Sequence, residues 1–160
     1  RVARQVSSTR WPGLLSARRL FEMATIDAAR ALGVDAFVGS LEVGKRADLV
    51  LLGGDPSQPY DALIAATPKN FELVMVDGRV MYGDPELKSA GPAAPGCETL
   101  QVCSASKFLC LAESATTNKL NQTFTDISSA LTSNLASYDT LVAPMNIPAF
   151  SPIAPLTKCP

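Results

Sequence analysis

Residues 16–54 hold two short helical patterns followed by a glycine-bounded apolar run, and this order constrains the fold more than any other part of the chain. Ser16 is a preferred helix N-cap residue, and the apolar residues after it have the spacing of one buried helical stripe. Thr25 is expected to cap a second helix by accepting from the backbone amide of Asp27 or Ala28, and Gly33 is a natural stop. The sequence therefore predicts two consecutive helices.

Two apolar runs after these helices are typical of β-strands. Residues 48–52 form a short apolar segment that precedes Gly53, and residues 71–76 form a second, imperfectly alternating one. Asp77-Gly78 follows the second run and tolerates the positive φ angles of a type I′ turn, so residues 79–82 are expected to return as the other strand of a hairpin.

The order of these segments resembles the amidohydrolase superfamily, in its imidazolonepropionase, chlorohydrolase and aminohydrolase-like branch. The resemblance is carried by Gly44-Lys45-Arg46-Ala47-Asp48 before the first strand and by Val76-Asp77-Gly78-Arg79-Val80 at the hairpin, and it covers residues 1 to about 84. It implies an α/β chain from the C-terminal end of a metal-dependent (β/α)8 barrel hydrolase. Residues 1–35 are then the last barrel helices, and residues 36–84 are strands of a small β-sandwich.

The resemblance also implies a reaction, although not the residues that perform it. Family members bind their metals chiefly through histidine, and this chain contains no histidine. A divalent metal, with zinc as the first candidate, is therefore expected on an N-terminal partner chain, and no catalytic or metal-ligating residue on this one. The implied reaction is hydrolysis of a C–N bond in a small cyclic amide or amidine-like substrate. Because Arg1 is not methionine, we expect the C-terminal chain of a processed enzyme, which could form a homo-oligomer once assembled.

A second hypothesis is that the chain is a non-catalytic binding or assembly subunit. The absence of histidine is compatible with this hypothesis too. Composition limits the classes of partner that both hypotheses allow. The net charge is −1 and the basic residues are scattered, which gives no support to nucleic-acid binding. No apolar run approaches the roughly 18 residues that a membrane span needs, so a soluble protein is expected.

The second half of the chain has a different character. Residues 85–96 resemble a linker, and residues 97–160 are expected to form a Cys-containing helical extension with a proline-rich tail. Helical spacing of apolar residues predicts one helix over residues 100–112 and another over residues 123–138. Five prolines beyond Tyr138 favour an extended strap.

All cysteines lie in this second half: Cys97, Cys103, Cys110 and Cys159. An even count in a small appended module favours disulfides over free thiols or a metal cluster, and hence a periplasmic or extracellular location. A helix over residues 100–112 would hold Cys103 and Cys110 on the order of 10 Å apart, too far for a bridge. Of the two remaining connectivities, we favour Cys97–Cys103 with Cys110–Cys159.

Four further residues invite a functional interpretation. Trp11, the single tryptophan, either forms part of a substrate wall or anchors the first helices. Lys45 is expected to face solvent and Asp48 to accept from nearby backbone amides, so both mark the fold and not the reaction. Thr123 completes a glycosylation sequon with Asn121 but is also a good helix cap, which is the favoured interpretation.

Overall fold

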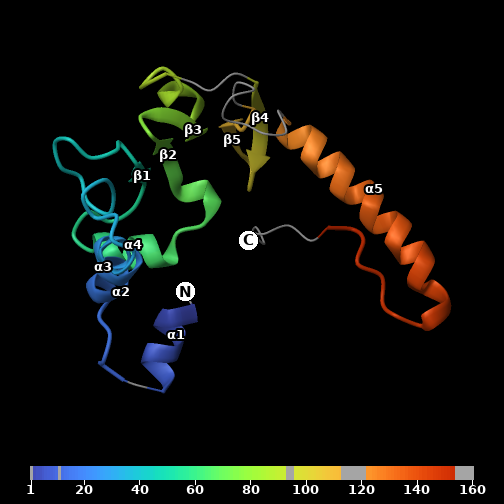
Figure 1. Cartoon of the computed structure of the whole chain (residues 1–160), viewed down its shortest axis with the longest axis horizontal. Coiled ribbons are helices and arrows are strands. Elements are labelled where there is room, and N and C mark those ends of the chain that lie inside the picture. The colour runs from blue at the N-terminus through green and yellow to red at the C-terminus, as the bar shows by residue number, and fades with distance from the viewer. Residues whose placement is uncertain (1, 11, 93–95, 113–121, 154–160) are drawn as a thin grey trace.

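The computed structural model describes residues 2–10, 12–92, 96–112 and 122–153. Short helices gather near the N-terminus, a twisted sheet follows, and one long helix extends away from the sheet, so that the chain forms an open arch (Figure 1). None of the helices in the described ranges is both long and apolar enough to cross a membrane.

The N-terminal helices are α1 (Val2–Thr9), α2 (Ala17–Ala24) and α3 (Ile26–Ala31). Ser16 caps α2 as expected, since its hydroxyl accepts from the Arg19 amide at 3.1 Å. The expected Thr25 cap is wrong, because the Thr25 hydroxyl donates to the Phe21 carbonyl at 2.8 Å. Gly33 ends α3 with φ +69°, and the Val34 amide donates back to Ala29, as in a Schellman motif.

The strands form one five-stranded sheet of order β1-β2-β3-β5-β4, antiparallel throughout. The strands are β1 (Leu49–Leu52), β2 (Phe71–Val76), β3 (Arg79–Gly83), β4 (Cys97–Val102) and β5 (Ala105–Cys110). Helix α4 (Pro59–Ala65) and the 3₁₀ turn η1 (Pro68–Asn70) connect β1 to β2, and η2 (Pro85–Leu87) follows β3. The predicted strands at 48–52 and 71–76 are therefore confirmed, within a single sheet in the described part of the chain.

The hairpin between β2 and β3 has the predicted turn. Asp77 and Gly78 adopt φ angles of 51° and 76°, the positive values that a type I′ turn requires at both central residues. A register shift between Val74 and Met75 adds a bulge to the pair. The Asp-Gly signal was therefore sufficient to locate this turn.

The predicted helix over residues 100–112 is wrong, because β4 and β5 form a second hairpin there. Its turn is Cys103-Ser104, with φ angles of 49° and 68°, so two residues without the usual glycine adopt a type I′ geometry. β5 also pairs with β3 through Tyr82 and Gly83, so tertiary pairing overrides the helical spacing. The domain boundaries stay predictions, although strand pairing runs across the predicted linker.

The favoured disulfide pairing is also wrong. Cys97 is bonded to Cys110, with the two Cα atoms 4.0 Å apart at one end of the β4–β5 ladder. The helix expected over residues 100–112 excluded only Cys103–Cys110 and did not decide between the two remaining connectivities. In the hairpin, the turn residue Cys103 lies at the opposite end from Cys97, whereas Cys110 lies directly across from it. Cys103 is itself disulfide-bonded, and Cys159 lies outside the described residues.

The core of the sheet is shared by three strands. Leu73 of β2, Val80 of β3, and Phe108 and Cys110 of β5 form one buried cluster. Lys107 lies beside them and is only 2% exposed. Its ammonium donates to the Asp84 carboxylate at 2.6 Å and to the Phe71 carbonyl at 2.9 Å, which pairs the buried charge as burial demands.

The long helix α5 (Phe124–Val142) confirms the second predicted helix and extends it by one turn, after which η3 (Ala143–Met145) follows. Thr123 is its N-cap and forms a capping box with Asp126, as favoured over the sequon; Asn121 lies outside the described residues. Glu98 of β4 accepts from the Phe124 amide at 2.7 Å and so ties the helix to the sheet.

Replacing Gly78 with valine is expected to destabilise the fold by about 1 kcal/mol or more, because a β-branched residue resists positive φ. Chemical denaturation monitored by circular dichroism would measure the loss. Gly78→Asn is the matched control, since asparagine tolerates this backbone conformation and should cost much less. Equal losses for both variants would contradict the backbone explanation.

Lys107→Met is expected to lower the free energy of unfolding by about 1–3 kcal/mol, because it removes the cation that pairs Asp84 and leaves the Phe71 carbonyl without this donor. Lys88→Met is the control at an exposed lysine and should change stability by less than about 0.5 kcal/mol. A Lys107 variant as stable as the Lys88 variant would show that packing alone joins β5 to β3.

Candidate functional site

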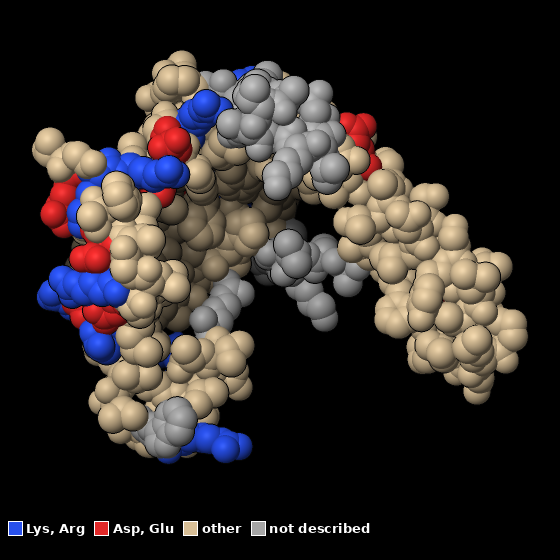
Figure 2. Space-filling view, viewed as in Figure 1, with Lys and Arg blue, Asp and Glu red and all other residues tan. Residues whose placement is uncertain are grey.

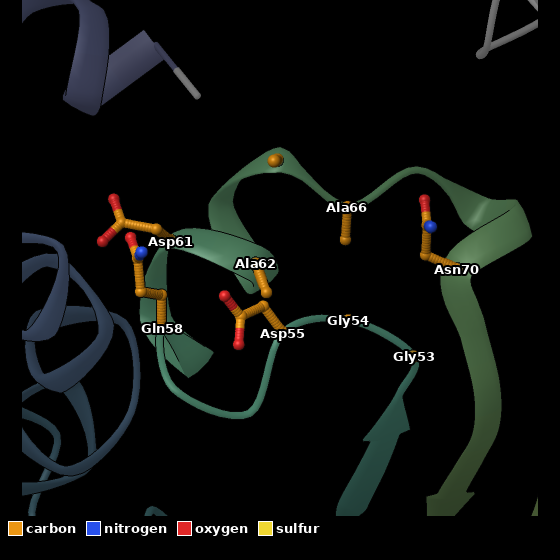
Figure 3. A pocket seen from close by; sticks show the side chains of 9 residues that line it. Gly53, Gly54, Asp55, Gln58, Asp61, Ala62, Ala66 and Asn70 are labelled. Atoms are coloured by element: carbon orange, nitrogen blue, oxygen red, sulfur yellow. The ribbon is translucent and has the colours of Figure 1, made fainter.

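A hollow in the described surface lies where β1 ends and α4 begins. It measures about 390 Å³ and is open to solvent. Figure 3 shows Asp61 and Gln58 at one end and Asn70 at the other, with the Gly53-Gly54 backbone between them. Its lining comprises Gly53, Gly54, Asp55, Gln58, Asp61, Ala62, Ala65, Ala66 and Asn70.

Two glycines shape the floor of this pocket. A Cβ on Gly54 would lie 2.9 Å from the Ala62 Cβ, and one on Gly53 would lie 2.7 Å from a Glu72 carboxylate oxygen. The Gly53 amide also donates to the Asn70 carbonyl at 3.0 Å. The chain therefore passes close to α4 because Gly54 lacks a side chain, whereas Gly53 lies against Glu72 of β2.

Most polar groups of the pocket are engaged by their own loops. The Asp55 carboxylate accepts from the Ser57 hydroxyl at 2.7 Å and the Ser57 amide at 2.8 Å, and these bonds lower the pKa of Asp55. The Asn70 side chain accepts from the Thr67 amide and hydroxyl. Asp61 pairs with Arg4 of α1 at 3.2 Å, so the pocket also links the first helix to α4.

This lining limits the chemistry that the pocket offers. Its side chains are carboxylates, amides and methyl groups, with no hydroxyl, thiol, amine or imidazole among the lining residues. A nucleophile paired with a base is therefore not assembled here. The carboxylate and amide oxygens of the lining can accept hydrogen bonds from a polar group. The lining residues otherwise connect the end of β1 to α4.

The described residues also do not fit a catalytic metal. Zinc-type sites need several His, Cys or carboxylate ligands, and no cluster of three such residues was found in the described part of the chain. The sequence has no histidine, and Cys97, Cys103 and Cys110 are disulfide-bonded.

The Gly-Lys-Arg-Ala-Asp motif has a structural role that was predicted only in part. Asp48 accepts from the backbone amide of Asp77 at 2.7 Å, so it bonds across to the hairpin turn and not within its own loop. Lys45 does not face solvent as expected, because its side chain is 13% exposed and donates to Ser40 at 2.6 Å. The motif therefore joins the start of β1 to the β2–β3 turn.

Other candidate residues fall outside the description or were missed. Trp11, the substrate-wall candidate, lies outside the described residues. The Lys107–Asp84 pair and the Glu98 cap were not identified from the sequence. Lysine in a strand is ordinarily exposed, and neither Asp84 nor Glu98 stands in a recognisable motif. These contacts join residues far apart in the chain, so the sequence around each residue gave no signal of them.

Comparison with known proteins places the first half of the chain. Residues 3–81 match the family model described as the amidohydrolase family. This match confirms the resemblance of the first half to the amidohydrolase family, and we name residues 3–81 the amidohydrolase segment. The segment contains α1 to α4 and β1 to β3, up to Met81 within β3.

Relatives of this amidohydrolase segment are named as deaminases and a hydrolase. A 5-methylthioadenosine/S-adenosylhomocysteine deaminase of Symbiobacterium thermophilum is 42% identical over 80 residues, which is 46% of this chain and 18% of that protein. A 5'-deoxyadenosine deaminase of Methanothermobacter thermautotrophicus is 36% identical over 84 residues, 48% of this chain and 19% of that protein. An S-triazine hydrolase of Gordonia rubripertincta is 49% identical over 78 residues, 44% of this chain and 16% of that protein.

The chain thus spans about a fifth of the length of the curated relatives that it matches. The family match ends within β3, so β4, β5 and α5 lie beyond it.

Proposed function

We propose that this chain is the C-terminal portion of a metal-dependent amidohydrolase that hydrolyses a C–N bond in a small molecule. The observation that carries the proposal is the family match of residues 3–81, together with relatives whose names are deaminase and hydrolase. Within that enzyme, the segment supports an N-terminal barrel portion that contains the reacting groups. The sequence predicts that the barrel portion is a separate N-terminal chain. The same proposal holds if both portions belong to one polypeptide.

An amidine-like carbon in a nitrogen heterocycle is the substrate class that we favour over a cyclic amide. The relatives are named for 5-methylthioadenosine, S-adenosylhomocysteine, 5'-deoxyadenosine and S-triazine. Adenine and triazine rings share a ring carbon that is doubly bonded to a ring nitrogen and carries an exocyclic group, and water attacks that carbon as the exocyclic group leaves. The side chains that choose among such rings are proposed to lie on the barrel portion.

The outer edge of β1 supports the proposed assembly. In the described sheet β1 pairs on one side only, with β2, and its Val50 and Leu51 side chains are 50% and 45% exposed. An apolar edge strand of this kind favours pairing with a further strand. β2 lies inside the sheet, between β1 and β3, so residues 71–76 do not form a second open edge.

A divalent metal, with zinc as the first candidate, is proposed for the barrel portion, in keeping with a family that is generally metal-dependent. The residues described here supply none of its ligands that we can identify. The Cys97–Cys110 disulfide supports a periplasmic or extracellular location, because structural disulfides persist in oxidising compartments.

The direct test is to purify the protein in its natural form and measure three properties. Intact-mass analysis should find the barrel portion with this chain, metal analysis should find a bound divalent ion, and 5'-methylthioadenosine should release ammonia. This chain isolated alone, folded, metal-free and inactive towards adenosine and triazine compounds, would overturn the proposal and favour a non-catalytic assembly subunit.

Leu51→Lys is expected to impair assembly, because it places a charge on the apolar edge that the barrel portion is proposed to cover. Co-purification with the barrel portion should fall about tenfold, equivalent to roughly 1.4 kcal/mol. Thr99→Lys adds the same charge at an exposed position of β4, the opposite edge of the sheet, and should leave co-purification unchanged. If both variants assemble like the natural chain, β1 is not the contact.

A further inference from the structure

The side chains of α5 repeat at the spacing of a helix-pairing seam. Steps of three and four residues alternate along Phe124, Ile127, Leu131, Asn134, Tyr138 and Leu141, which we name the α5 seam. One step of three and one of four make a seven-residue repeat, which keeps one stripe of a helix facing a partner helix. Five of these six side chains are apolar or aromatic, so the spacing coincides with a hydrophobic stripe.

The α5 seam is open to solvent over much of its length. Leu131 is 50% exposed, Tyr138 is 48% exposed and Leu141 is 71% exposed. Figure 1 shows α5 extending away from the sheet, in contrast to α2 and α4, which contact each other. A helix of this length normally owes its stability to packing of an apolar face, and the described chain provides little of it.

The chain after α5 returns along the helix, where it bonds Asp139 and contacts the seam at Tyr138. Asp139 accepts from the backbone amides of Phe150 at 2.7 Å and Ser151 at 2.8 Å, and these bonds lower the pKa of Asp139. The Tyr138 and Phe150 rings meet edge to face at 5.7 Å. Val142, which lies off the seam, is buried. The returning segment therefore leaves Leu131 and Leu141 uncovered.

Charge is absent from the seam and from both of its borders. Asp126 and Asp139 are the charged residues of α5, and the first closes the capping box while the second holds the returning segment. The bordering positions are Ser128, Ala130, Leu135 and Ser137, all uncharged. Figure 2 shows α5 almost without the blue and red of charged residues, whereas the end of the molecule that holds the N-terminal helices shows both colours. Two copies of the α5 seam can therefore meet without like charges facing each other.

We propose that α5 pairs with α5 of a second copy of this chain, with the seam buried between them. Asn134 favours a second copy of α5 over a purely apolar partner surface. It is the one amide of the seam and lies near its middle, so in a parallel pair the two Asn134 side chains lie at the same level and can hydrogen-bond each other. A purely apolar partner surface would instead leave the buried Asn134 amide without a hydrogen-bond partner, which costs stability.

The base of α5 is built to hold the helix in position for this contact. The Glu98 carboxylate accepts from the Phe124 amide at 2.7 Å and the Thr125 amide at 3.3 Å, and it also bonds the Thr125 hydroxyl. A negative side chain at a helix N-terminus is stabilising. α5 thus leaves the sheet from a fixed point, and the seam is presented without rearrangement of β4.

The test is the oligomeric state of the complete natural protein, measured by sedimentation and light scattering over a range of concentrations. Leu131→Asp puts a charge inside the seam and should raise the dimer dissociation constant at least about tenfold. Ser129→Asp puts the same charge on the opposite side of α5 and should leave the dimer unchanged. Asn134→Leu should tighten association and admit larger oligomers.

Two results would overturn the proposal. One is a natural protein that stays monomeric at all concentrations, as expected if α5 packs against another part of its own protein. The other is a dimer that Leu131→Asp does not weaken, which would place the interface elsewhere. Circular dichroism confirms that the variant folds, and Leu141→Asp replaces it if it does not. Oligomeric state is measured without any assay of C–N hydrolysis, so failure of the proposed function leaves this test intact.

Discussion

The buried ammonium of Lys107 holds together two parts of the chain, of which only the first matches the amidohydrolase family. It bonds Asp84, just after β3, and the carbonyl of Phe71, at the start of β2, while its own strand is β5. β2 and most of β3 lie in the amidohydrolase segment, and β5 lies beyond it. β3 and β5 pair directly through only Tyr82 and Gly83 in the ladder, so a buried ion pair adds a specific link where backbone pairing is short. The second hairpin, its disulfide and α5 all depend on that junction.

The first half of the fold could be predicted because its signals are local. Ser16, Gly33 and Asp77-Gly78 each determine a cap, a stop or a turn through their own backbone preferences, and the structure places them accordingly. The same reasoning failed at Thr25, where the hydroxyl bonds back into the preceding helix. It also failed at Cys103-Ser104, where a type I′ turn forms without glycine and neighbouring strands decide the outcome.

The candidate site shows the same division between local and distant information. The resemblance of the first half to amidohydrolases could be read from short motifs, and the family match confirms it. The Lys107 ion pair joins residues 23 positions apart, and the Glu98 cap acts over 26 positions. Such contacts arise only when strands meet, and single residues carry no mark of them beforehand. The disulfide pairing was missed for the same reason, since only the strand register places Cys97 directly across from Cys110.

The attachment of α5 has a consequence for how its direction can change. The helix leaves the sheet at Thr123 and is fastened there by one carboxylate, that of Glu98, next to the disulfide-bonded Cys97. Among the described residues, Glu98 anchors this pivot from β4, so a substitution at position 98 would remove that anchor and leave the backbone pairing of β4 with β5 in place. The geometry of whatever the helix carries or contacts is thus adjustable in evolution at one site, separately from the stability of the sheet.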